Sequence, residues 1–185
     1  MQISSKTPLI FILTALGFLV LILSLIRASI DTSKMGSDEG QIYSIEFQEN
    51  HDNNLIVSNY SFPYPGILPD SPFYLLKKAR NSCWLFLTME PLDKAEIELM
   101  MADKDVASAI MLKEDHKDKW ATSSFREAHN YLNRSFQDAQ KIENQIQKRL
   151  LLQKLKDAAK AYQTVALKYD FDISPTYKQI LETEL

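Results

Sequence analysis

The sequence predicts an all-α protein: a single N-terminal transmembrane helix, a flexible linker, and an antiparallel bundle of about four to five helices. Three observations lead to this prediction. Residues 8–26 are uncharged and mostly apolar, with the length of roughly 20 residues that crosses a bilayer core. Residues 92–174 contain neither glycine nor proline, so the usual turn residues are missing. Within that stretch, apolar residues recur at spacings of three and four, the period of an amphipathic helix.

The apolar segment 8–26 can be a cleaved signal peptide or a permanent anchor. Its apolar run is longer than the roughly 7–15 residues of a signal peptide, and Arg27 stands where a cleavage site needs a small residue. We therefore favour a single-pass signal-anchor in the cell membrane. Lys6 and the amino terminus precede the span, and Arg27 and Lys34 follow it, so the positive charges counted by the positive-inside rule are nearly balanced. The short N-terminal tail favours a cytoplasmic N-terminus and an extracytoplasmic helical domain.

Three regions follow from this reading: the tail and anchor (residues 1–27), a flexible linker (28–60) and a helical domain (61–185). Most of the linker is too polar to bury much surface. Residues 42–47 and 55–57 have strand-like patterns, but no partner strand is evident for either. We expect them to form loosely ordered patches.

Composition excludes some classes of protein. The chain has 24 acidic and 21 basic residues and a net charge of −3, which argues against a nucleic-acid-binding protein. Its one cysteine, Cys83, rules out an internal disulfide. Because Cys83 has apolar neighbours in the sequence, we expect a small buried side chain there.

Helix boundaries in the domain follow from caps and polar runs. The first helix is expected from Ser71 to Thr88, and the second begins at Glu90 and Pro91. The polar run 113–118 is the best turn before the third helix. A break near Asn144 would separate the third and fourth helices, although one long bent helix is also possible. A last short helix follows Pro175.

The apolar spacing also predicts the core. Short connections imply antiparallel neighbours, and the heptad-like spacing leaves a two-chain coiled coil possible. The predicted core positions are Leu92, Ala95, Leu99, Ala102, Val106, Ala109, Lys113, Ala121, Phe125, Ala128, Leu132, Ser135, Ala139, Ile142, Ile146, Leu151, Leu155, Ala158, Tyr162, Val165 and Tyr169.

A proline-rich segment, residues 61–73, opens the domain; we call it the clasp. Its four prolines predict extended backbone with a turn at Gly66. Its aromatic and aliphatic side chains favour packing against the bundle, and docking of a polyproline conformation to a partner is the alternative. The residues of a possible interaction segment are Phe62, Tyr64, Pro65, Gly66, Leu68, Pro69, Pro72 and Tyr74.

The run YPGILPDSPFYLLK, residues 64–77, resembles the PGxLPxxPxYxLK signature of an uncharacterised bacterial domain-of-unknown-function family. In that family the signature opens a helical domain behind an N-terminal membrane anchor. Residues 85–88, 93–96, 102–104 and 152–159 are similar to later blocks of the family. Ser71 and Asp105 depart from the pattern, where His and Arg are frequent. The resemblance implies an envelope-facing helical module and no reaction.

No residue pattern predicts a catalytic group, a cofactor or a metal. His116 and His129 lack the Glu three residues earlier that a di-metal bundle needs. The acids at 96 and 98, and those at 103 and 105, stand two apart on a helix, and we interpret them as solvated surface.

Two further groups have a structural and a functional interpretation. A basic cluster at Lys77, Lys78 and Arg80 is expected to be solvated, and contact with anionic headgroups is the alternative. Six aromatic residues could line a ligand cavity, but an aromatic core is the expected arrangement. They are Trp84, Phe86, Trp120, Phe125, Tyr131 and Phe136.

These patterns together predict a non-enzymatic, membrane-anchored helical module outside the cell membrane. It touches the bilayer through residues 8–26 and binds an unknown protein partner or scaffolds the envelope. A ligand-sensing bundle is the alternative, and it would need a cavity of a few hundred Å³ among the helices. An enzyme would need polar side chains that converge in a cleft.

Overall fold

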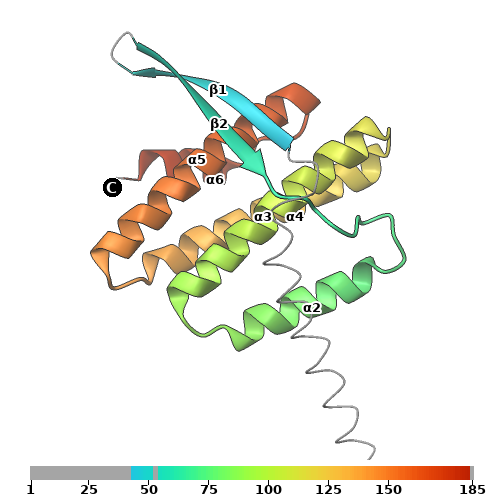
Figure 1. Cartoon of the computed structure of the whole chain (residues 1–185), viewed down its shortest axis with the longest axis horizontal. Coiled ribbons are helices and arrows are strands. Elements are labelled where there is room, and N and C mark those ends of the chain that lie inside the picture. Colours follow the sequence, from blue (N-terminus) through green and yellow to red (C-terminus); the bar gives the residue numbers. More distant parts are fainter. Residues whose placement is uncertain (1–42, 52–53, 184–185) are drawn as a thin grey trace, which may run out of the picture. The chain divides into compact units, whose positions relative to one another are not determined.

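The structure is a computed structural model that describes residues 43–51 and 54–183. Within these ranges it is mostly helical, and its helices pack as a bundle (Figure 1). They are α2 (Tyr74–Leu87), α3 (Pro91–Glu114), α4 (Asp118–Gln140), α5 (Gln145–Tyr169) and α6 (Pro175–Glu182). The predicted anchor at 8–26 lies outside the described residues. Among the helices that are described, none is both long and apolar enough to cross a membrane.

A β-hairpin precedes the helices, so the all-α prediction was wrong for this region. Strand β1 (Tyr43–His51) pairs antiparallel with β2 (Asn54–Phe62), in a register that joins Tyr43 to Phe62. The two segments interpreted as unpartnered patches of a linker are each other's partner. The polar run between them is rich in Asn and Asp, which favour turns. Of the predicted linker, residues 28–42 lie outside the described ranges.

Helix ends match the sequence signals closely. The break near Asn144 is confirmed: its side chain accepts hydrogen bonds from the backbone N–H groups of Ile146 and Gln147 and so caps α5. Asp170 ends α5 with a left-handed φ of 56°. The turn between α3 and α4 contains His116, with a φ of 59°. Helix α2 starts three residues later than predicted, after a turn at residues 70–73.

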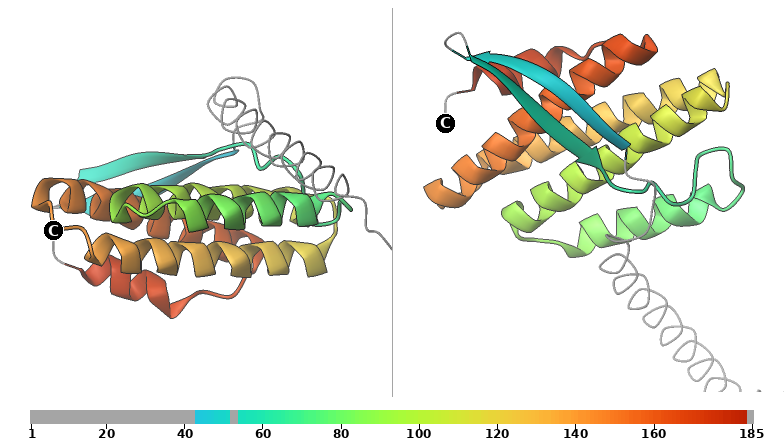
Figure 2. Two further views of the ribbon diagram at one scale, coloured as in Figure 1. Left: turned by 90° about the horizontal axis from the view of Figure 1, so that it is seen from below. Right: turned by 45° about the horizontal axis from the view of Figure 1, so that its top comes forward.

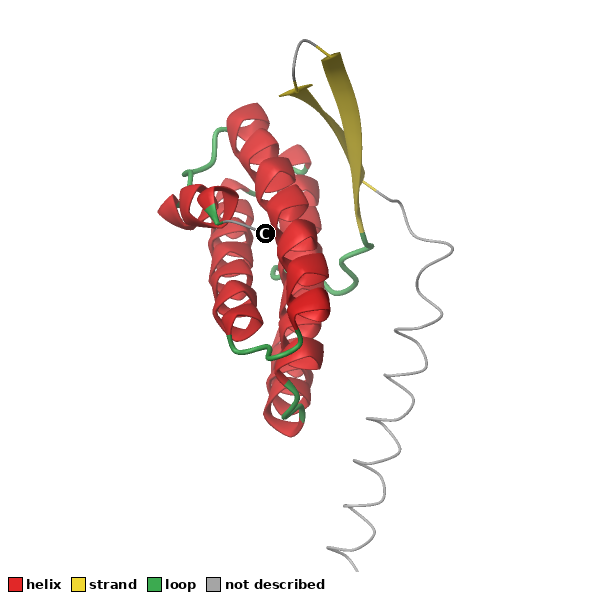
Figure 3. Ribbon diagram, turned by 90° about the vertical axis from the view of Figure 1, so that its left-hand side faces the viewer, coloured by secondary structure: helices red, strands yellow, loops and turns green. Residues whose placement is uncertain are grey.

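The predicted stripes form the core. All the positions from Ala95 to Ala109, from Ala121 to Ile142 and from Leu151 to Val165 in these stripes are buried. Ile146 is the main exception: it is 74% exposed because it lies in the first turn of α5. The hairpin and α6 lie on opposite sides of the three long helices α3, α4 and α5 (Figures 2 and 3). Helix α2 packs against the bundle through α3.

Candidate functional site: the clasp and helix α2

The clasp is held by a buried lysine. The Lys77 ammonium, on the first turn of α2, donates hydrogen bonds to the backbone carbonyls of Pro65 at 3.0 Å and Ile67 at 3.2 Å. It also lies 3.9 Å from a carboxylate oxygen of Asp105 on α3, and both side chains are only 7% exposed. Gly66, between the two carbonyls, has a φ of +70°, which glycine adopts without steric cost. The expectation that Lys77 is solvated was therefore wrong, and we call this arrangement the lysine latch.

The latch gives the clasp an inner and an outer side. Phe62, Pro65 and Pro69 are buried, and Leu68 and Tyr74 are half-buried. Tyr64, Gly66 and Pro72 are exposed. The predicted interaction residues are thus divided: one set packs inward and the other faces solvent.

A surface ion pair also holds the clasp to the bundle. The Asp70 carboxylate lies 2.7 Å from the ammonium of Lys117, which comes just before α4. This hydrogen bond lowers the pKa of Asp70. Residues 65–67 and Asp70 of the clasp are therefore tied to different elements, α2 and the residue before α4.

Three carboxyl groups that we interpreted as solvated surface lie in the interior instead. Asp103 accepts hydrogen bonds of 2.8 Å from the hydroxyls of Tyr60 on β2 and Tyr162 on α5. Burial raises its pKa to about 7, although the two hydroxyls act in the opposite direction. Burial also raises the pKa of Asp105 to about 7, against the effect of Lys77. Because α3 is covered on several sides, two acids pointing in different directions can both be buried.

The third buried carboxyl belongs to Glu98, which is 1% exposed. Burial, followed by the nearby Asp138 carboxylate, raises its pKa to about 7. Asp138 on α4 forms ion pairs with Lys94 at 3.2 Å and with Lys141. This cluster joins α3 to α4 through charge as well as through apolar packing. Nowhere in the described ranges do three or more His, Cys, Asp or Glu side chains gather so that they could hold a metal ion.

His129 helps to hold α6 against α4. Its Nδ1 lies 2.6 Å from the Tyr177 hydroxyl, and its Nε2 lies 3.2 Å from the backbone carbonyl of Asp172. Burial lowers the pKa of His129. The ring also packs edge-on against Phe125 and Tyr177. These contacts give His129 a structural role on the inner side of α6.

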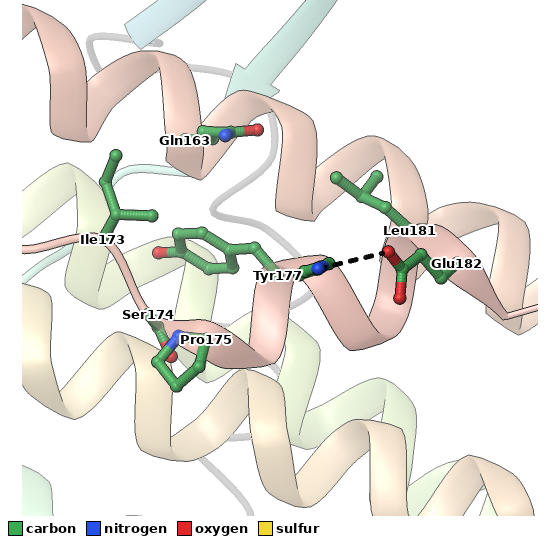
Figure 4. A pocket seen from close by; sticks show the side chains of 8 residues that line it. Gln163, Ile173, Ser174, Pro175, Tyr177, Leu181 and Glu182 are labelled. Atoms are coloured by element: carbon green, nitrogen blue, oxygen red, sulfur yellow. Dashed lines mark ion pairs between the residues drawn. The ribbon is translucent and has the colours of Figure 1, made fainter.

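A hollow of about 500 Å³ lies beside α6 (Figure 4). Gln163 of α5 forms one side, and α6 with the preceding residues 173–174 forms the rest. An ion pair of 3.8 Å between Lys178 and Glu182 lies along α6. The hollow is therefore bounded by the surfaces of two neighbouring helices, α5 and α6.

The chain matches a known protein family. Residues 66–172 match the model of a family described as a domain of unknown function, DUF5667. The chain belongs to this family. No curated protein and no solved structure matches the chain. The match begins at Gly66 and so includes most of the latch, helix α2 and the buried carboxyls of α3, whereas Pro65 and the hairpin precede it.

In helix α2 of the DUF5667 domain the most buried side chains are polar and several large apolar side chains are exposed. Its buried residues are the polar Lys77 and Asn81, while Leu75 is 75% exposed and Phe86 is 85% exposed. Cys83 is exposed as well, so the prediction of a buried thiol was wrong. The sequence had signalled this helix but not which of its faces would turn inward.

The aromatic core of the DUF5667 domain is smaller than expected. Phe125, Tyr131 and Phe136 are buried in it. Trp84 is half-buried, and Trp120 is 44% exposed. Trp84 packs against the core from its edge, so the prediction of a core position was wrong for Phe86 and Trp120.

Proposed function

We propose that the chain is a non-enzymatic, membrane-anchored module that presents its helical domain to a protein partner outside the cell membrane. The anchoring part of the proposal is supported by the uncharged apolar segment 8–26. The observation that carries the interaction is the lysine latch, which fixes one side of the clasp and leaves the other side exposed.

The exposed side of the clasp has the properties of a binding surface. Tyr64 is 45% exposed, Ile67 is 43% exposed, and Phe73 is 61% exposed. Large aromatic and aliphatic side chains of this kind supply much of the binding energy at interfaces. The prolines and the latch fix the backbone before binding, which reduces the entropy lost on association.

The location is tested by protease accessibility in intact cells that express the full chain. Added protease should cleave the helical domain when it is extracytoplasmic, and the protein should stay with the membrane after alkaline carbonate extraction. Cleavage only after the cells are opened would contradict the proposed location. Release by carbonate would contradict the anchor.

The interaction is tested by placing a photo-crosslinking amino acid at Tyr64 in the same cells. The matched control carries it at Gln153, an exposed position on α5. We expect a discrete adduct from position 64 that is absent from position 153. The adduct should be lost when Lys77→Met opens the latch and retained with Lys78→Met. Equal adduct patterns from both positions would refute a binding role for the clasp.

A further inference from the structure

The outward face of α2 is a large apolar surface. Leu75, Leu76, Phe86 and Leu87 are between 64% and 85% exposed. At roughly 200 Å² for a fully exposed large side chain, these four side chains present about 580 Å². Monomeric proteins usually expose apolar patches of only a few hundred Å², and larger ones mark interaction sites. We therefore expect this face to be covered by a binding partner.

Basic residues border this face on both sides. At 100° per residue, Lys78 and Arg80 lie on opposite flanks of the strip that contains Leu75, Leu76 and Phe86. Helix α2 carries no acidic residue, although the whole chain has a net charge of −3. The nearest counter-charge to the Lys78 ammonium is Glu127, at 3.4 Å.

An apolar strip with basic residues along its edges is the pattern of a helix that lies in the plane of a membrane interface. The long apolar stems of Lys and Arg let their charges reach the headgroups while the strip faces the acyl chains. The Arg80 guanidinium donates to the side-chain oxygen of Asn81, so it also lies at the rim of the buried face. The charges on both rims are thus positioned to meet anionic headgroups.

We propose that this face of α2 lies on an anionic lipid bilayer, in the membrane that holds segment 8–26. The inference rests on the anchoring part of the proposed function. Even fully extended, residues 27–42 span at most about 55 Å, so an anchored chain keeps the domain close to the bilayer.

A second copy of the chain is a less favourable occupant of this face. Both rims are positive, so two α2 helices that meet face to face bring like charges together in either orientation. An anionic surface instead offers a counter-charge to Arg80 and a second one to Lys78, beside Glu127. The charge pattern therefore favours lipid over self-association.

Cys83 makes the proposal testable, because the one cysteine of the chain is exposed on this face. The full chain is labelled there with an environment-sensitive fluorophore and reconstituted into vesicles of phosphatidylcholine alone or of an equimolar mixture with phosphatidylglycerol. In the mixed vesicles we expect the emission of the label to shift to the blue and to be quenched by nitroxide-labelled lipid. Its quenching by aqueous iodide should be several-fold weaker than in vesicles of phosphatidylcholine alone. A matched control carries Cys83→Ser with Gln153→Cys on α5, and its label should stay accessible to iodide in both vesicles.

Reversing the rim charges supplies the second variant. Lys78→Glu with Arg80→Glu leaves the latch intact and should abolish the preference for anionic vesicles. Flotation after carbonate washing reports the anchor separately. If the chain floats but iodide still quenches its Cys83 label, the proposed lipid contact of α2 is refuted while the anchor is supported. If the chain does not float and iodide quenches the label, both the anchor and the lipid contact are refuted. A label that is shielded from iodide but not reached by the lipid-borne quencher shows a protein covering α2, which also overturns the proposal.

Discussion

Replacing Lys77 with methionine tests the latch directly. The substitution keeps a long apolar stem but removes the hydrogen bonds to the carbonyls of Pro65 and Ile67 and the partner of Asp105. Removing one member of a buried ion pair typically costs about 3–5 kcal/mol. We expect a loss of that size in the free energy of unfolding at about pH 8. It can be measured by urea unfolding of the full chain in mild detergent, followed through the fluorescence of Trp84 and Trp120.

The loss should depend on pH. The pKa of Asp105 is about 7, so near pH 5 its carboxyl is neutral in the folded protein and needs no counter-charge. The cost of Lys77→Met should then fall to about 1–3 kcal/mol, the penalty for leaving buried carbonyls without donors. Lys78→Met is the matched control: Lys78 is 46% exposed and pairs only at the surface, so its loss should be below about 1 kcal/mol. Equal losses at positions 77 and 78, or a loss at position 77 that is the same at both pH values, would refute the reasoning.

Three other predictions use the same unfolding assay. Tyr60→Phe removes one of the hydrogen bonds to Asp103 and should cost about 1–2 kcal/mol, with faster hydrogen exchange in strand β2; unchanged exchange would contradict it. Gly66→Ala should cost about 1–2 kcal/mol through its positive φ alone, because nothing lies within 4 Å of the added Cβ; a larger loss would indicate crowding. The free energy of unfolding of the unmodified chain should fall as the pH rises from about 4 to 7. Over that range Glu98, Asp103 and Asp105, with folded pKa values of about 7, bind more protons folded than unfolded. A rise would refute their burial.

Spacing along the chain was enough to predict most of the helical domain. Burial of an apolar stripe is a local property, since side chains three and four apart share one face of a helix. This is why Val106, Leu132 and Leu155 were identified as core residues from the sequence alone. The caps at Asn144 and Ser174 are local as well, since each accepts hydrogen bonds from backbone groups two or three residues ahead. Signals of this kind do not depend on what packs against the helix.

The buried acids could not be predicted in the same way. Asp103 and Asp105 stand on different sides of α3, and a helix with one solvated face would leave at least one of them in water. Here the hairpin brings Tyr60 to the first, and α2 brings Lys77 to the second. Both partners come from more than 25 residues away in the chain, and the hairpin itself was missed. The departure at Asp105 from the family's frequent Arg, which left any ion pair there in doubt, turned out to supply the acid of the latch.

The inverted polarity of α2 and the latch are two consequences of one arrangement. Helix α2 turns three of its leucines outward and places Lys77 and Asn81 against the domain, and each buried polar group then needs a partner. Lys77 finds its partners in Asp105 and in two carbonyls that Gly66 turns toward it. With Met at position 77 the inner face keeps Asn81 as its buried polar residue but loses the hydrogen bonds and the ion pair of Lys77, so fewer interactions hold this face against the domain. Lys77→Met, which loosens the clasp, should therefore also loosen the packing of α2 against the domain. The quenching of the Cys83 label should then change in the same variant that opens the latch.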